Sequence, residues 1–125
     1  TKKMAGRSGF LKKKGHVVKN MKKRWFVLND SDDKILYYKP ITDLLKVANY
    51  ASQKPQGVIN LRDSMLYLDE GNNTTLLLDT TQADGSVKQF WIEAESVTDR
   101  DAWVNVIMQR PNVTLVTLEL KGEQK

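Results

Sequence analysis

Two clusters of basic residues near the start of the chain offer its clearest chemistry. Residues 12–14 (KKK) form the first cluster and residues 22–24 (KKR) form the second. Lysine ammonium and arginine guanidinium groups make charge-assisted hydrogen bonds to phosphates, and the arginine fork can hold two oxygens at once. Seven residues separate the clusters, so they lie side by side if the chain turns back between them. These residues therefore predict a site for an anionic ligand.

The residues around both clusters alternate in the way that β-strands require. Successive side chains of a strand point to opposite faces, so Leu11 and Lys13 share one face of a first strand. Arg24 and Phe26 share one face of a second strand for the same reason. If the two strands pair as a hairpin, one face carries apolar residues at one end and cations at the other. This arrangement predicts a basic socket at the open end of a sheet.

Only part of the basic set is expected to bind an anion directly. Lys13, Lys22 and Arg24 lie in phase with the apolar residues of the predicted core. The other three basic residues point to the opposite face: Lys12, Lys14 and Lys23. We expect these three to add general electrostatic attraction and no specific contact.

The composition is that of an ordinary globular domain, but the charge is unevenly distributed. The chain has 125 residues, of which 40% are hydrophobic and 28% are charged, as in a single folded domain. Residues 1–62 contain 15 Lys and Arg and four Asp and Glu, a net charge of +11. Residues 63–125 contain five and 11 of these, a net charge of −6. One side of the molecule is thus suited to phosphate-bearing partners.

The hydrophobic pattern predicts seven strands followed by one helix. The strands are expected over residues 9–14, 22–29, 34–39, 58–61, 65–68, 74–79 and 87–93. Short strands at such intervals indicate an antiparallel barrel or sandwich. A helix then begins at Ser96 or Thr98 and ends before Pro111. Its apolar stripe consists of Ala102, Trp103, Val106 and Ile107.

The remaining segments suggest how the domain is bounded. We expect residues 1–8 to be a flexible basic lead-in, residues 9–110 to be the domain, and residues 111–125 to be an extension. Within that extension, residues 113–120 alternate loosely and fit either an added edge strand or a linker. Residues 42–51 have helical spacing and predict a short helix inside the long loop before the fourth strand.

Several function classes lack the residues they need. The chain has no cysteine and one histidine, and it contains no GxSxG, P-loop or HExxH pattern. Its acidic residues are scattered in predicted turns and on the predicted helix. No apolar run approaches the roughly 20 residues of a membrane-spanning helix. We therefore expect a binding module, with no catalytic residues, metal or cofactor.

The motifs and their order resemble the pleckstrin homology (PH) domain. Residues 9–15 (GFLKKKG) resemble the family's opening G-(W/F)-L-x-K-x-G, and residues 22–28 (KKRWFVL) resemble its second strand, (K/R)-x-R-(W/Y)-F-x-L. Residues 35–38 (ILYY) resemble its third strand, and residues 101–103 (DAW) resemble its helix around a nearly universal tryptophan. The resemblance covers about residues 9–110 and implies a seven-stranded antiparallel barrel or sandwich capped by one C-terminal helix.

The resemblance also implies a ligand and the residues that hold it. The pattern is similar to phosphoinositide-binding members such as the cytohesin and Akt-type PH domains. It assigns headgroup phosphates to three basic residues: Lys13, Lys22 and Arg24. It further assigns a hydroxyl contact to Tyr38 on the third strand. Lys19 and Lys54 are expected to line the rim of the same site.

The resemblance to phosphoinositide-binding PH domains also implies recruitment to a membrane. Val17 and Val18 are apolar residues within the cationic first loop, and their exposed methyl groups are candidates for insertion between lipid headgroups. We expect the domain to recruit a larger signalling protein from the cytoplasm to a membrane, in particular the plasma membrane.

Three departures from the cytohesin pattern leave the inositol isomer open. Val17 and Gln56 stand where those domains carry arginines, and the nearest basic residue to their strand 6–7 histidine is Lys88. A preference for 3-phosphorylated lipids is therefore one alternative among several.

Two other functions remain as alternatives. A PH-fold protein-interaction domain would use a peptide groove or the 113–120 segment and would bind anionic lipids without specificity. A nucleic-acid-binding β-barrel would need aromatic residues interleaved with the basic patch, whereas Trp25 faces away from Arg24. We rank nucleic acid last among the partners.

Overall fold

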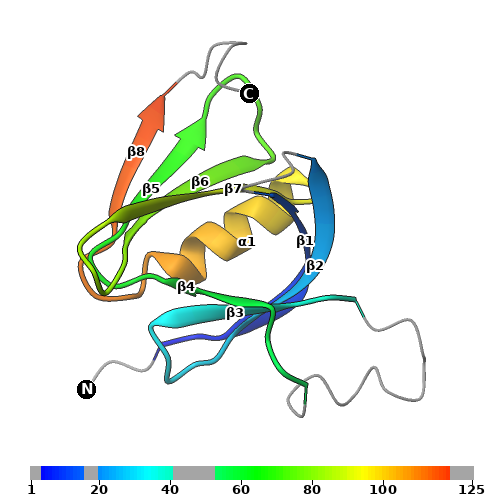
Figure 1. The fold of residues 1–125 in the computed structure, drawn as a ribbon. Coiled ribbons are helices and arrows are strands. Elements are labelled where there is room, and N and C mark those ends of the chain that lie inside the picture. Colours follow the sequence, from blue (N-terminus) through cyan, green and yellow to red (C-terminus); the bar gives the residue numbers. More distant parts are fainter. Residues whose placement is uncertain (1–3, 16–19, 41–52, 119–125) are drawn as a thin grey trace.

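The alternating stretches of the sequence form β-strands, and the stretch with helical period forms a helix (Figure 1). The computed structural model describes residues 4–15, 20–40 and 53–118. The elements in chain order are β1 (Arg7–Lys14), β2 (Met21–Leu28), β3 (Lys34–Tyr38), β4 (Gly57–Asn60), β5 (Met65–Asp69), β6 (Thr75–Thr81), β7 (Val87–Glu93), α1 (Val97–Ile107) and β8 (Thr114–Leu118).

The strands of the described residues join into one bent sheet in the order β4-β3-β2-β1-β7-β6-β5-β8. All neighbours are antiparallel except β5 and β8, which run parallel. Figure 1 shows that the sheet bends so that β3 and β4 face β5 and β6, with α1 between the two halves. The fold is therefore the expected β-rich architecture with a C-terminal helix. The sheet nevertheless has two edges, β4 and β8, and does not close into a barrel.

The core fills the space inside this bend. Every strand from β1 to β7 contributes alternate apolar side chains to it, and α1 contributes one stripe. Trp103 of α1 is 1% exposed and meets the ring of Phe26 edge-on, with 6.4 Å between ring centroids. Burial of such large apolar side chains is the main source of stability in a domain of this size.

The helix begins and ends where local chemistry dictates. The Ser96 hydroxyl accepts a hydrogen bond from the Asp99 N–H at 3.0 Å, so Ser96 is the N-cap. Of the predicted stripe, Trp103, Val106 and Ile107 are buried. Arg7 at the start of β1 pairs with Asp99 at 2.7 Å, so α1 lies against the end of the β1–β2 hairpin where β1 begins. Lys13 and Lys22 lie at the other end of that hairpin.

Most strand boundaries differ from those expected by one or two residues, and one strand is added. The first strand begins at Arg7, two residues earlier, since Arg7 and Ser8 pair with Leu28 and Val27 on β2. An eighth strand is present, β8, and it is the edge strand that was one of two alternatives for residues 113–120. It runs parallel to β5, so the sheet is not wholly antiparallel. The helix predicted over residues 42–51 lies outside the described residues. Within those residues, no helix is long and apolar enough to span a membrane.

Candidate functional site

The β1–β2 hairpin brings together the three basic residues singled out by the sequence. Leu11 pairs with Arg24, and Lys13 pairs with Lys22. Residues that are paired across two strands project to the same face of a sheet. Leu11 is 2% exposed and belongs to the core, so Lys13, Lys22 and Arg24 all lie on the inner face of the bend. The prediction that these cations share the core face of the hairpin is confirmed.

Lys13 is the most enclosed of the three. Its Nζ lies 5.1 Å from the centroid of the Tyr37 ring and 5.8 Å from that of the Phe90 ring. It donates a long hydrogen bond, 3.4 Å, to the Lys14 carbonyl. Aromatic faces attract cations, which helps to hold the ammonium at a half-buried position. The Lys13 ammonium is therefore positioned before any ligand arrives.

A fourth cation, Lys88 on β7, joins this group. Its Nζ lies 5.2 Å from the Phe90 centroid, so Lys13 and Lys88 share one aromatic ring. Lys88 lies on the same face of β7 as Phe90 and Ile92, both of which are buried. Pairing of Lys13 with Ile92 across β1 and β7 brings these two strands together at the site. The sequence signalled Lys88 through its phase with Phe90 and Ile92 and as the basic residue nearest to the strand 6–7 histidine of the cytohesin pattern.

Arg24 is anchored beside the segment that leads into β4. Its Nε donates to the Gln56 Oε1 at 2.5 Å, and one of its terminal nitrogens donates to the Lys23 carbonyl at 2.8 Å. The Gln56 N–H donates in turn to the Tyr37 carbonyl at 2.8 Å, which fixes that segment against β3. Lys54 is exposed two residues before Gln56, so this rim segment lies next to the guanidinium. Gln56 therefore positions Arg24.

Tyr37 lies on the same face of β3 as the basic residues of the site, whereas Tyr38, to which the resemblance assigns a hydroxyl contact, lies on the other face. Tyr37 pairs with Phe26 and stacks on its ring, which places Tyr37 on the inner face. Tyr38 pairs with Trp25 and therefore projects to the opposite face of β3. The hydroxyl end of Tyr37 reaches Gly57, where a Cβ would overlap it. Glycine at this position thus leaves room for the phenol.

Val17, Val18 and Lys19 lie outside the described residues. Lys12, Lys14 and Lys23 lie on the outer face, as expected. Lys14 Nζ is 5.2 Å from the Trp91 centroid and Lys23 Nζ is 4.6 Å from the Phe10 centroid.

The site residues Lys13, Lys22, Arg24 and Lys88, called here the inner cationic cluster, all carry positive charge. Burial lowers the pKa of the Lys13 ammonium, and the charges of Lys88 and Arg24 lower it further. Burial raises the pKa of the Tyr37 phenol, while the Arg24 charge acts in the opposite direction. None of the ion pairs within the described part of the chain involves Lys13, Lys88 or Arg24. Cations thus converge here, and no ion pair with a carboxylate of the described residues balances them.

Comparison with known proteins identifies the family. The family model described as "PH domain" matches residues 5–110. The chain belongs to the PH domain family. This PH domain is also similar to the C-terminal PH domain of pleckstrin, solved in complex with D-myo-Ins(1,2,3,4,5)P5. The two are 26% identical with a TM-score of 0.62, over 84% of this chain and 96% of the pleckstrin chain.

Two curated relatives contain a similar PH domain sequence. "Uncharacterized protein CG43867" from Drosophila melanogaster is 30% identical over 119 residues, which are 94% of this chain and 6% of that protein. "Pleckstrin homology domain-containing protein 1" from Arabidopsis thaliana is 29% identical over 101 residues, 81% of this chain and 65% of that protein. The chain therefore spans a small part of the fly protein and about two thirds of the plant protein.

Proposed function

We propose that this PH domain binds the phosphorylated inositol headgroup of a membrane lipid at the inner cationic cluster. The residues that contact phosphates are Lys13, Lys22, Arg24 and Lys88, with the Tyr37 hydroxyl beside them. The observation that carries the proposal is the half-buried Lys13 ammonium, which faces two further cations and has no carboxylate partner among the described residues.

Such a cluster is unfavourable until an anion enters it. Like charges at close range in a partly buried site raise the free energy of the unliganded protein. A ligand with several phosphates removes this repulsion and gains charge-assisted hydrogen bonds from each ammonium and from the Arg24 fork. A single carboxylate offers less charge over a smaller span. The geometry therefore favours a ligand with clustered phosphates, of which the headgroup of a phosphoinositide lipid is a membrane-borne form.

The similarity to pleckstrin supports this ligand chemistry. That PH domain was solved with an inositol pentaphosphate, and it is 26% identical to this chain over 84% of this chain's residues. An inositol phosphate bound by that relative supports a ligand of the same class at the inner cationic cluster of this domain.

Membrane recruitment extends the proposal. Electrostatic attraction between the basic half of the molecule and an anionic leaflet would contribute about 1 kcal/mol for each Lys or Arg near the surface. Lys19 and Lys54 would line the rim of the site, and Val17 and Val18 would enter the headgroup layer. The domain would thereby hold a larger signalling protein at the cytoplasmic face of a membrane, with the plasma membrane as the first candidate.

A liposome panel tests the proposal. Vesicles of neutral lipid would each carry one 3-, 4- or 5-phosphorylated phosphoinositide, with phosphatidylserine adjusted to equalise the surface charge. We expect at least one phosphoinositide to bind with micromolar affinity, about −8 kcal/mol, and more tightly than charge-matched phosphatidylserine vesicles. A preference for the 3-phosphorylated lipids would identify the isomer. Binding that follows surface charge alone would instead support a PH-fold protein-interaction domain.

A further inference from the structure

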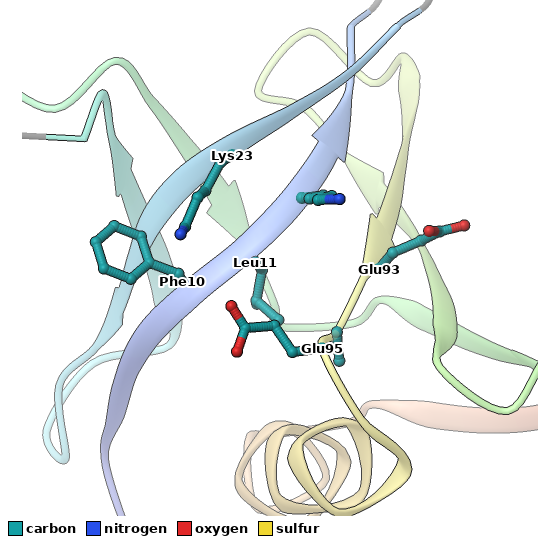
Figure 2. Close-up of a pocket in the computed structure, with 7 residues that line it drawn as sticks. Phe10, Leu11, Lys23, Glu93 and Glu95 are labelled. Carbon is teal, nitrogen blue, oxygen red and sulfur yellow. The ribbon is translucent and has the colours of Figure 1, made fainter.

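A pocket lies on the outer side of β1, away from the inner cationic cluster. It has a volume of about 450 Å³, within the range of pockets that hold small ligands or peptide side chains. Figure 2 shows that β1 runs across it, with β2 on one side and the start of α1 on the other. Its lining residues are Phe10, Leu11, Lys12, Lys23, Glu93, Ala94 and Glu95.

The two sides of this pocket carry opposite charges that do not neutralise each other. Lys23 extends from β2 toward Phe10, while Glu95 extends from the segment before α1 toward β1 (Figure 2). Lys12 and Glu93 are paired across β1 and β7. No ion pair within the described residues joins these lysines to these glutamates. The pocket therefore presents two ammoniums and two carboxylates to a partner, of which the Glu93 carboxylate also accepts a long hydrogen bond, 3.5 Å, from the Thr75 hydroxyl.

An apolar surface lies between the charged groups. Phe10 is half-buried and packs edge-on against Trp25, with 4.7 Å between ring centroids. Ala94 and Leu11 also line the pocket, but the Leu11 side chain is 2% exposed and belongs to the core, so Phe10 is the main apolar contact for a ligand. A ligand would gain hydrophobic contact at this surface and ionic contact at both rims.

This combination excludes a purely anionic partner. Glu93 and Glu95 would repel a phosphate backbone or an anionic leaflet that approached Lys12 and Lys23. The Phe10 ring is also covered on one side by the Lys23 ammonium, 4.6 Å from the centroid, which hinders base stacking. A partner that matches the pocket must carry both signs of charge around an apolar group.

We propose that this pocket docks an extended segment of a partner protein with an acidic, an apolar and a basic side chain on one face. The acidic group pairs with Lys12 and Lys23, the apolar group lies on Phe10, and the basic group pairs with Glu93 and Glu95. In an extended peptide, side chains at positions i, i+2 and i+4 share a face. The matching sequence pattern is therefore acid-x-apolar-x-base, in either chain direction.

This pocket and the inner cluster can be occupied together. Lys12 and Lys13 are adjacent on β1 and point to opposite faces of the sheet. The Lys12–Lys23 pair is also two residues along β1 from Lys14–Met21, the last pair between β1 and β2 before the loop. The domain could thus hold a lipid at one face and a protein segment at the other. The inference does not depend on the lipid proposal.

The test mixes the whole chain with each of three capped peptides. Fluorescence anisotropy measures the affinity, and NMR amide shifts locate the binding site. The probe is Asp-Ser-Leu-Ser-Lys, and the controls are Asp-Ser-Leu-Ser-Asp and Lys-Ser-Leu-Ser-Lys. We expect the mixed-charge probe to bind about three- to fivefold more tightly than either control, the upper range of one exposed ion pair. The amides that shift should be those of the pocket, Phe10 to Lys12 and Glu93 to Glu95.

Three variants sharpen the test. Glu95→Lys should reverse the preference, so that the peptide with two aspartates binds best. Glu70→Lys makes the same charge change at an exposed position of the β5–β6 turn and should leave the preference unaltered. Arg24→Ala should greatly weaken phosphoinositide binding yet retain peptide binding, which separates the two proposals. Equal affinities for the three peptides, shifts outside the pocket, or a reversal by Glu70→Lys would each overturn the inference.

Discussion

The Lys13 ammonium lies 5.1 Å from the centroid of the Tyr37 ring, inside the bend of the sheet. This contact joins β1 to β3 at the open end of the core and fixes the position of the Lys13 ammonium. Because burial and two neighbouring cations lower the pKa of Lys13, the free domain bears an electrostatic cost that a bound phosphate removes. The central feature of the site is thus a cation placed for a ligand.

The same contact predicts a pH dependence of ligand binding. In the free domain the pKa of Lys13 is below its usual 10.5, and a bound phosphate would raise it again. Affinity for a soluble inositol phosphate should therefore be constant near neutral pH and fall as pH rises through the lowered pKa. In Lys13→Arg the guanidinium stays charged throughout, so this part of the fall should disappear. Calorimetric titration across the alkaline range measures both proteins, and identical pH profiles would argue against Lys13 as a phosphate ligand.

Lys88 should contribute to binding although it is distant in sequence from the two basic clusters. Lys88→Ala removes one charge-assisted contact, and we expect affinity for the soluble headgroup to fall about tenfold. Lys34→Ala is the matched control, since Lys34 is exposed at the start of β3, near the opposite end of the hairpin. Titration of both variants with the same inositol phosphate decides the point. Equal losses of affinity in the two variants would mean that Lys88 contributes only general electrostatic attraction.

Local periodicity was enough to predict the hairpin part of the site. Lys13 and Arg24 alternate with Leu11 and Phe26, and a period of two assigns faces within each strand without further information. The cap at Ser96 and the buried stripe around Trp103 also follow from neighbouring residues. These features were predictable because each depends on contacts within a few residues along the chain.

The parts that depend on distant pairing could not be derived in this way. Tyr37 and Tyr38 are adjacent, and only the register of β3 against β2 decides which one faces the core. Lys88 reaches Lys13 through the β1–β7 pairing. The parallel pairing of β8 with β5 likewise has no signal in the alternation of residues 113–120. Register between separated strands is set by the whole core.

Arg110 should be a major determinant of stability. Its side chain is 2% exposed and donates four hydrogen bonds of 2.7 to 2.9 Å to backbone carbonyls. The acceptors are the carbonyl oxygens of Ala5, Asn29, Asp32 and Val106. These bonds tie the N-terminal segment and the β2–β3 turn to the end of α1. The single ammonium of a lysine cannot reach all four acceptors, so Arg110→Lys should lower the free energy of unfolding by about 2–4 kcal/mol.

Urea unfolding followed by tryptophan fluorescence measures this loss. The control is Arg62→Lys, because the Arg62 side chain is 62% exposed and pairs only with Asp33 among the described residues. We expect that control to change stability by less than about 0.5 kcal/mol. A similar small change for Arg110→Lys would mean that the buried guanidinium is not essential to the fold.

The most direct test of the central claim is phosphoinositide liposome binding by Arg24→Ala, compared with Lys34→Ala. Both variants remove one positive charge, but only Arg24 lies on the inner face beside Lys13. We predict that Arg24→Ala weakens binding at least about thirtyfold, ~2 kcal/mol, with an unchanged unfolding temperature, while Lys34→Ala binds nearly as well as the parent. Retained binding by a folded Arg24→Ala domain would contradict the proposed site.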